Sequence, residues 1–286
     1  MIKTTIVEPI LWAYMFCIAI STPLQTQLVY LKTCLGHFNS SYCKTIVHSK
    51  NETYQAQQNI LQKETAEWDM YLDAIKMTPV LISMLVFTAY FDKVGRKKVM
   101  ILPIIGGTLS SINLILNSYF IHWPIQILFI GTFLDGICGQ SASMLASLFA
   151  YVGDTTSIEM RTKRAVILES MSFLGGLIGH PTSGVILQSY GFTPTFLLLF
   201  SMFIFQIVYW MFLKESYPPQ SKEPSVTLKT PKKWFSQIFR VLWRKRKDNG
   251  RKLLVVLFTI FLLAVLSKFL FFIFSGNYMT CTEGQI

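Results

Sequence analysis

Seven long apolar stretches limit what this chain can fold into. They lie at roughly residues 9–30, 70–90, 99–121, 125–153, 165–189, 193–213 and 253–276. Each is comparable to the roughly 20 residues that an α-helix needs to cross a bilayer. The whole chain is 52% hydrophobic and 14% charged, whereas soluble domains carry about 25% charged residues. We therefore predict an all-α, polytopic membrane protein.

The basic residues are confined to alternate gaps between these stretches. The gaps after the second, fourth and sixth stretches hold four, three and twelve Lys or Arg residues, and those after the third and fifth hold none. Basic loops stay on the cytoplasmic side during insertion, so we expect a cytoplasmic N-terminus. This pattern explains the net charge of +11 without nucleic acid. It also disfavours a seven-helix receptor, whose N-terminus would lie outside.

The long gap at residues 31–69 is predicted to be an outer loop. It contains two N-glycosylation sequons, at Asn39 and Asn51, which are expected in chain exposed outside the cytosol. Cys34 and Cys43 lie in the same loop, and Cys281 follows the seventh stretch, also on the predicted outer side. Disulfides persist in such compartments, but three cysteines leave the pairing open.

Three regions follow from this pattern. Residues 1–213 are predicted to form a six-helix bundle, and residues 253–286 carry the seventh span. Between them, residues 214–252 form a basic cytoplasmic linker. Its first part bears prolines and is expected to be flexible. Apolar residues at helical spacing among basic ones at 232–247 predict an amphipathic helix on an anionic membrane surface.

The stretch YFDKVGRKK at residues 90–98 predicts a tight turn between two spans. Gly95 allows backbone angles that other residues disfavour, and Asp92 can stabilise the start of the next helix. Arg96 can form a forked ion pair with a carboxylate, for which Asp154 or Glu159 are the candidates. Such pairs can hold one face of a bundle shut. On charge alone, a basic loop that only sets orientation is the favoured interpretation.

Ionisable residues inside the apolar stretches are candidate functional groups, because burying them in a membrane is costly. Glu169 and Asp135 are candidates for binding protons, since burial favours a neutral carboxyl. Asp73 and Lys76 lie one helical turn apart. They form either an internal ion pair or a site where Lys76 attracts an anionic substrate. The sequence shows no catalytic, metal-binding or cofactor-binding motif, so an enzyme is not expected.

Several motifs resemble those of known transporters. The run from Asp92 to Lys97 resembles the loop between the second and third helices of major facilitator transporters. Other segments resemble the proton-coupled folate transporter family (solute carrier family 46) in order and spacing. These are Val7-Glu8-Pro9, residues 23–27, Trp68 with Tyr71, Arg161 to Arg164 followed by Ile167-Leu168-Glu169, and residues 281–286.

This resemblance implies a fold of two six-helix bundles, of which the chain would hold the first bundle and one further helix. It implies proton-coupled transport of a small organic anion, folate-like or otherwise, by alternating access. It places a proton-coupling acid at Glu169 and a functional position of the fourth span at Gln140, which we group with Lys76 as substrate residues. It also implies a disulfide from Cys281 to Cys43 or Cys34.

The resemblance leaves further questions open. The chain would be a fragment or short isoform, and a non-transporting isoform that pairs with full-length carriers is the alternative. The implied partners are protons, a small organic anion and the lipid bilayer. Plasma membrane and lysosomal membrane are both compatible with the sequence.

Overall fold

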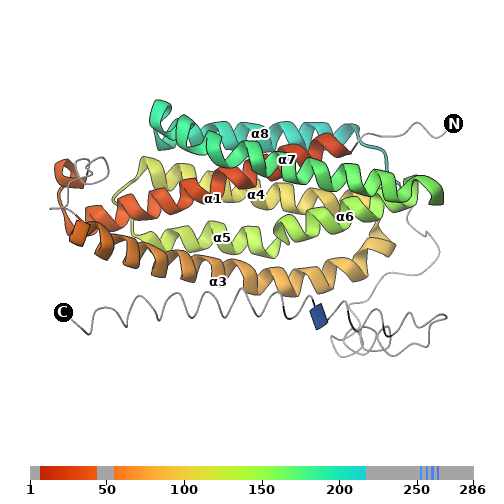
Figure 1. Cartoon of the computed structure of the whole chain (residues 1–286), viewed down its shortest axis with the longest axis horizontal. Helices are drawn as coiled ribbons and strands as arrows, with labels where there is room; N and C mark the ends of the chain where they lie inside the picture. Colours follow the sequence, from red (N-terminus) through yellow and green to blue (C-terminus); the bar gives the residue numbers. More distant parts are fainter. Residues whose placement is uncertain are drawn as a thin grey trace. The chain divides into compact units, whose positions relative to one another are not determined.

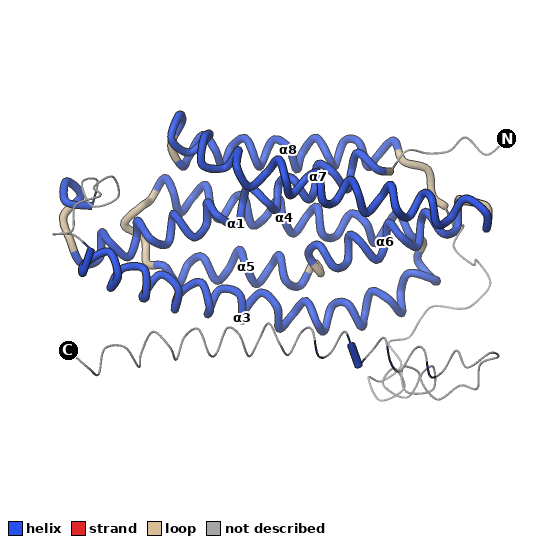
Figure 2. Tube along the Cα trace, in the orientation of Figure 1, coloured by secondary structure: helices blue, strands red, loops and turns tan. Residues whose placement is uncertain are grey.

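A computed structural model describes residues 7–43, residues 55–216 and a few positions between 252 and 263. All regular structure in the described residues is helical (Figure 2). The chain divides into two compact units, Met1–Gln220 and Ser221–Ile286, and only the first is described over most of its length. The amphipathic linker helix that the sequence predicts lies outside the described residues, and so does the predicted seventh span apart from four positions between 256 and 263.

Long helices run side by side along the first unit (Figure 1). They agree with the first six predicted spans, except that a break divides the fourth. Their bounds are α1 (Glu8–His37), α3 (Gln55–Val94), α4 (Arg96–Tyr119), a short 3-10 turn (Ile125–Ile127), α5 (Leu128–Ile137), α6 (Gln140–Thr155), α7 (Ile158–Tyr190) and α8 (Phe192–Phe212).

Polar residues are buried in this unit and large apolar residues are exposed, which is the arrangement of a membrane protein. Asn117, Ser143 and Gln206 are inside, whereas Phe173 and Phe212 are more than two-thirds exposed. In the described part, the segments Arg96–Tyr119, Ile125–Thr155 and Phe192–Phe212 are long and apolar enough to cross a membrane. The spans predicted within α1, α3 and α7 are richer in polar residues. The chain is an all-α polytopic membrane protein.

Helix α1 occupies the centre of the unit. It contacts α3, α6, α7 and α8, and Leu11, Tyr14, Ile20 and Leu28 along its length are fully buried. Its most extensive contact is with α7, which lies along it in Figure 1. A side chain at Gly175 or Gly179 of α7 would collide with the α1 backbone. Small residues permit this close helix contact.

The predicted outer loop is shorter than expected. Helix α1 continues to His37 and α3 already begins at Gln55, so much of the interval 31–69 is helical. The early turns of α3 are stabilised by burial, because Leu61 packs with Cys34 and Cys43 in a small apolar cluster. Asn39 starts a short helical turn and is exposed, whereas Asn51 lies outside the described residues.

The disulfide in the structure differs from the one implied by the resemblance. Cys34 is bonded to Cys43, with their Cα atoms 5.9 Å apart, which is within the range that a disulfide requires. The last turn of α1 and the helical turn after Asn39 bring the two together. Cys43 is therefore not available to Cys281, which lies outside the described residues.

Candidate functional site

The turn between α3 and α4 carries an ion pair at one end of the bundle. Gly95 has a φ of 102°, a conformation that favours glycine. Directly after it, Arg96 Nε lies 3.0 Å from Asp154 Oδ2 at the end of α6. Of the two predicted partners, Asp154 makes the contact, and Glu159 lies exposed in the first turn of α7. The side chain of Asp92 is outside the described residues. We call this end of the bundle the Arg96 end.

The end of α8 is bound to the same turn. The Glu215 carboxylate accepts a hydrogen bond of 3.0 Å from the Lys97 backbone N–H and lies against Gly95. A carboxylate at this position compensates the partial positive charge of the α4 N-terminus. The Trp210 indole donates to the Lys97 carbonyl at 2.8 Å, and the Lys97 ammonium lies 4.8 Å from the centre of the Trp210 ring.

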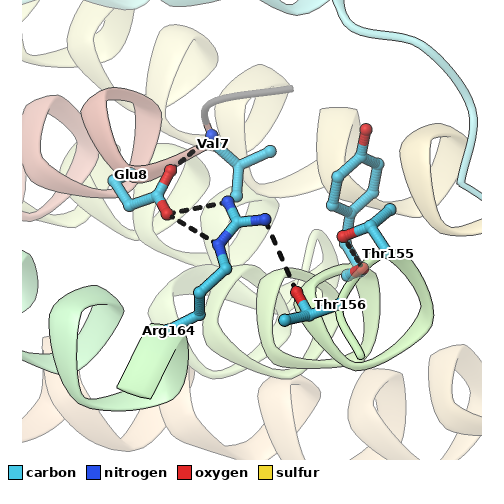
Figure 3. A network of polar contacts seen from close by, with 6 residues as sticks. Val7, Glu8, Thr155, Thr156 and Arg164 are labelled. Atoms are coloured by element: carbon cyan, nitrogen blue, oxygen red, sulfur yellow. Dashed lines mark hydrogen bonds and ion pairs between the residues drawn. The ribbon is translucent and has the colours of Figure 1, made fainter. Parts of the chain in front are cut away.

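A second ion pair at the Arg96 end joins α1 to α7. Arg164 Nη2 and Nε donate to the same oxygen of Glu8, at 2.8 and 3.3 Å. The other Glu8 oxygen accepts from the Val7 backbone N–H, and Arg164 Nη1 also reaches Thr156 Oγ1 at 3.5 Å (Figure 3). Arg164 therefore connects the start of α1 with the segment between α6 and α7.

The predicted fourth span is interrupted close to its middle. Helix α5 ends at Ile137, and Gly139, with a φ of 81°, precedes α6. Gln140 follows with a φ of 47°, a rare conformation for a residue with a side chain. On α3, the Ser83 hydroxyl donates at 2.6 Å to the carbonyl of Ile137, which the break leaves without a helical partner. Interrupted helices often form the binding sites of transporters.

Asp135 lies in α5 one turn before this break. It is 5% exposed, and among the described residues its Oδ1 has no hydrogen-bond partner. Lys76 of α3 is close enough for the two charges to interact, and its ammonium lies 2.9 Å from Asp73 Oδ1. The structure thus brings together two of the predicted residues, Asp135 and Lys76, from different helices.

Glu169 occupies a different environment. The sequence predicts a buried carboxyl, but Glu169 is exposed on α7. The expectation of burial is wrong because α7 packs against α1 through a narrow stripe of Leu168, Gly175 and Gly179. Apart from smaller contacts with α6 and α8, the first unit leaves the remaining surface of α7 uncovered.

The opposite end of the bundle, which we call the Lys32 end, has a buried amine. Lys32 of α1 is 5% exposed and donates to Asn117 Oδ1 and to the Trp123 carbonyl, both at 2.9 Å. Burial lowers the pKa of Lys32 to about 8, because a charged amine is disfavoured away from water. Nearby on α3, burial raises the pKa of Asp69, and a hydrogen bond from Thr26 opposes that shift.

Sequence reasoning did not identify Ser83, Glu215 or Glu8 as partners in these sites. Glu8 was noted only as part of a motif that resembles the transporter family. Its position at the start of a span, among predicted cytoplasmic basic residues, was a usable signal. The contact of Ser83 follows from a helix break that the apolar run conceals. Among the described residues, no three His, Cys, Asp or Glu side chains are grouped as a metal would require.

The sequence pattern of the Major Facilitator Superfamily matches residues 11–281. The lysosomal proton-coupled steroid conjugate and bile acid symporter SLC46A3 of Gallus gallus is 31% identical over 96% of this chain and 60% of its own length. The Homo sapiens protein of the same name is 25% identical over 90% and 58%.

A second kind of transporter is also similar. The proton-coupled folate transporter of Rattus norvegicus is 25% identical over 77% of this chain and 47% of its own length. The chain therefore spans about half to three-fifths of these relatives. All three relatives are named as transporters and none as an enzyme.

Proposed function

Because this chain belongs to the major facilitator superfamily, we propose that it forms the first bundle of a proton-coupled carrier for a small organic anion. The observation that carries the proposal is the paired closure of the Arg96 end. Arg96 with Asp154 ties α4 to α6, and Arg164 with Glu8 ties α1 to α7. Alternating access needs contacts that hold one end shut and then release it.

The orientation is inferred from the basic residues. The gaps after the second and fourth spans, and the start of the gap after the sixth, lie at the Arg96 end, and basic loops stay in the cytoplasm. We place the Arg96 end, and with it the N-terminus, on the cytoplasmic side. The Lys32 end and Asn39 then face the lumen or the exterior, where Asn39 can be glycosylated. Both lysosomal and plasma membranes fit this orientation, and the lysosomal relatives favour the former.

Glu169 and Asp135 are the proposed proton-binding residues, and they suit different roles. Glu169 is exposed on a face of α7 that the first bundle leaves uncovered, so water or a second bundle can reach it. Asp135 is enclosed within the bundle beside the broken fourth span. A proton bound at either site removes a negative charge, which would otherwise oppose the entry of an anion.

The proposed substrate class is an organic anion, and the names of the relatives indicate which kinds of anion to test. Those named above carry steroid conjugates, bile acids or folate. Gln140 supports such a role because it follows the helix break and is half-buried. Lys76 supports it less directly, since its ammonium is engaged with Asp73.

The test is uptake in cells that express this chain joined to the second bundle of the Gallus gallus relative. We expect uptake of a labelled bile acid or steroid sulfate to increase with an inward proton gradient. Glu169→Gln should remove the dependence on pH while leaving surface expression intact. Glu159→Gln, at an exposed position on the same helix, is the matched control. Uptake that is unaffected by pH in the unmodified chimaera would refute proton coupling.

The role of Arg96 and Asp154 in closing the Arg96 end is tested by exchanging their charges. Arg96→Asp and Asp154→Arg should each reduce uptake, because each leaves a charge facing a like charge. The double variant should recover uptake if the pair acts through its attraction. Double variants that remain as inactive as the singles would contradict the role given to this pair.

A further inference from the structure

We propose that Lys76 is a counter-ion that exchanges between Asp73 and Asp135 as Asp135 gains and loses a proton. The inference rests on the proposed proton coupling and extends it to two residues of α3. It assigns Asp73 a part in the proton cycle and gives Lys76 a role other than substrate binding.

The first step is the state of Asp135. An ionised carboxylate in an apolar interior is strongly disfavoured unless it is paired and hydrogen-bonded. Asp135 is 5% exposed, and its Oδ1 lacks a hydrogen-bond partner among the described residues. The arrangement in the structure therefore suits a neutral, protonated Asp135.

The second step is the position of Lys76. Its ammonium is bonded to Asp73 at 2.9 Å, and the Lys76 side chain is 14% exposed while that of Asp73 is 62% exposed. Lys76 is also close enough to stabilise Asp135 in its ionised form. The two helices meet at this point, because Gly136 of α5 packs directly against the Lys76 carbonyl and Pro79 of α3.

The third step is the movement. A lysine side chain is a flexible four-carbon stem with a compact charge, so the ammonium can turn from Asp73 toward α5 without displacing the backbone. When Asp135 releases its proton, its carboxylate needs a partner and Lys76 supplies it. Asp73 is left behind, and its exposure allows water to solvate its charge. The only chemical change is one proton transferred between water and a carboxylate oxygen.

Two other ionisable groups of the described chain lie close to Asp135. Tyr14 approaches from α1, and Cys138 directly follows α5. Each is neutral near pH 7, so neither replaces Lys76 as the positive partner. On α3, Asp69 also interacts with Asp73 and Lys76, which adds a negative charge on the Asp73 side.

The test uses the whole chain in lipid nanodiscs and does not require transport. Infrared spectra taken across a pH series report the carbonyl stretch of protonated carboxylic acids. We expect Asp135→Asn to remove one such band, which identifies it. Lys76→Met should keep the band present to a pH about one to three units higher, because the ionised carboxylate loses its partner.

Asp73→Asn should act in the opposite direction. Without its competitor, Lys76 stays with Asp135, so the band should disappear at a lower pH than in the unmodified chain. The double variant of Lys76→Met and Asp73→Asn should behave like Lys76→Met alone. A lysine with a purely structural role in the pair with Asp73 would not give opposite shifts.

Glu67→Gln is the matched control, because Glu67 is an exposed acid of α3 two residues before Asp69 and hence on the other side of the helix. It should leave the band unchanged. The exchange would be overturned if the band in Asp73→Asn disappeared at the same pH as in the unmodified chain or at a higher one. It would also be overturned if Asp135→Asn removed no band. The two proposals can fail separately. If the band shifts fail but uptake is still driven by protons, the transport proposal stands. If the band shifts occur as expected but uptake is not driven by protons, only the transport proposal is rejected.

Discussion

The contact between α1 and α7 predicts opposite effects for two neighbouring glycines. A Cβ atom added at Gly175 would lie 2.8 Å from the Trp12 carbonyl oxygen and 2.9 Å from the Phe16 backbone nitrogen. Both neighbours are helix backbone, so the clash can be relieved only by moving the helices apart. Overpacking of this kind costs about 1–3 kcal/mol. At Gly176, in contrast, no atom lies within 4 Å of the added Cβ.

Gly176→Ala should therefore stabilise the bundle slightly, because alanine is about 1 kcal/mol more favourable than glycine in a helix. Each variant adds one methyl group to α7, and the two methyl groups are one residue apart. Both variants gain the same helix propensity, so we expect their unfolding free energies to differ by about 1–3 kcal/mol, the cost of the clash alone. Gly179→Ala and Gly184→Ala provide a second pair of the same kind, because only the former meets α1.

The assay is thermal unfolding in detergent, followed with a fluorophore that reacts with thiols. Cys17 is fully buried in α1 and becomes reactive when the bundle opens. Gly175→Ala should unfold at a lower temperature than the unmodified chain, and Gly176→Ala at the same or a higher one. Equal unfolding temperatures for the two variants would refute the close packing of α7 on α1.

Three further predictions concern the ends of the bundle. Burial lowers the pKa of Lys32 from 10.5 to about 8, so between these pH values the unfolded chain binds more protons than the folded chain. The stability of the fold should therefore rise with pH across that window. Lys32→Met should abolish this rise in thermal scans at pH 7 to 10. Cys34→Ser should destabilise the chain by about 2–3 kcal/mol, and non-reducing peptide mapping should recover Cys34 linked to Cys43; a map with either one free would contradict the structure. Glu215→Gln keeps the shape of the side chain but removes the charge at the start of α4, so it should lower the unfolding free energy by about 0.3–1 kcal/mol. An unfolding temperature that is unchanged in low salt would contradict the assigned contact.

The sequence is sufficient to locate the helices of the first bundle because each is a long apolar run. It is also sufficient to identify Arg96 with Asp154 or Glu159, since few acids lie in the gaps on the predicted cytoplasmic side. It cannot reveal the break after α5, because residues 125–153 form one continuous, mostly apolar run and a glycine inside a helix usually indicates close packing. Only the backbone of Gly139 and Gln140, both with positive φ, shows that the helix stops and restarts.

Contacts between distant residues were the least predictable part of the site. Glu215 reaches the backbone of Lys97, and the Lys32 amine reaches Asn117. Neither pair is set by spacing along one helix, since each depends on how whole helices pack. The outer loop was misjudged for a related reason: a polar segment at the start of α3 becomes helical where Leu61 is buried against the disulfide.

The two ends of the bundle are held by different kinds of contact, and this difference indicates which end would change during the proposed transport cycle. At the Arg96 end, the side chains of Arg96 and Asp154 are 15% and 28% exposed. An ion pair that water can reach contributes about 0–1 kcal/mol, so the pair of Arg96 and Asp154 forms and breaks readily. At the Lys32 end, a disulfide links the end of α1 to the turn that follows it, and a buried amine joins α1 to Asn117 of α4 and to Trp123 through two hydrogen bonds. Breaking those bonds would leave buried polar groups unpaired at about 1–3 kcal/mol each. The Arg96 end is therefore the one that we expect to rearrange, while the Lys32 end keeps its internal packing.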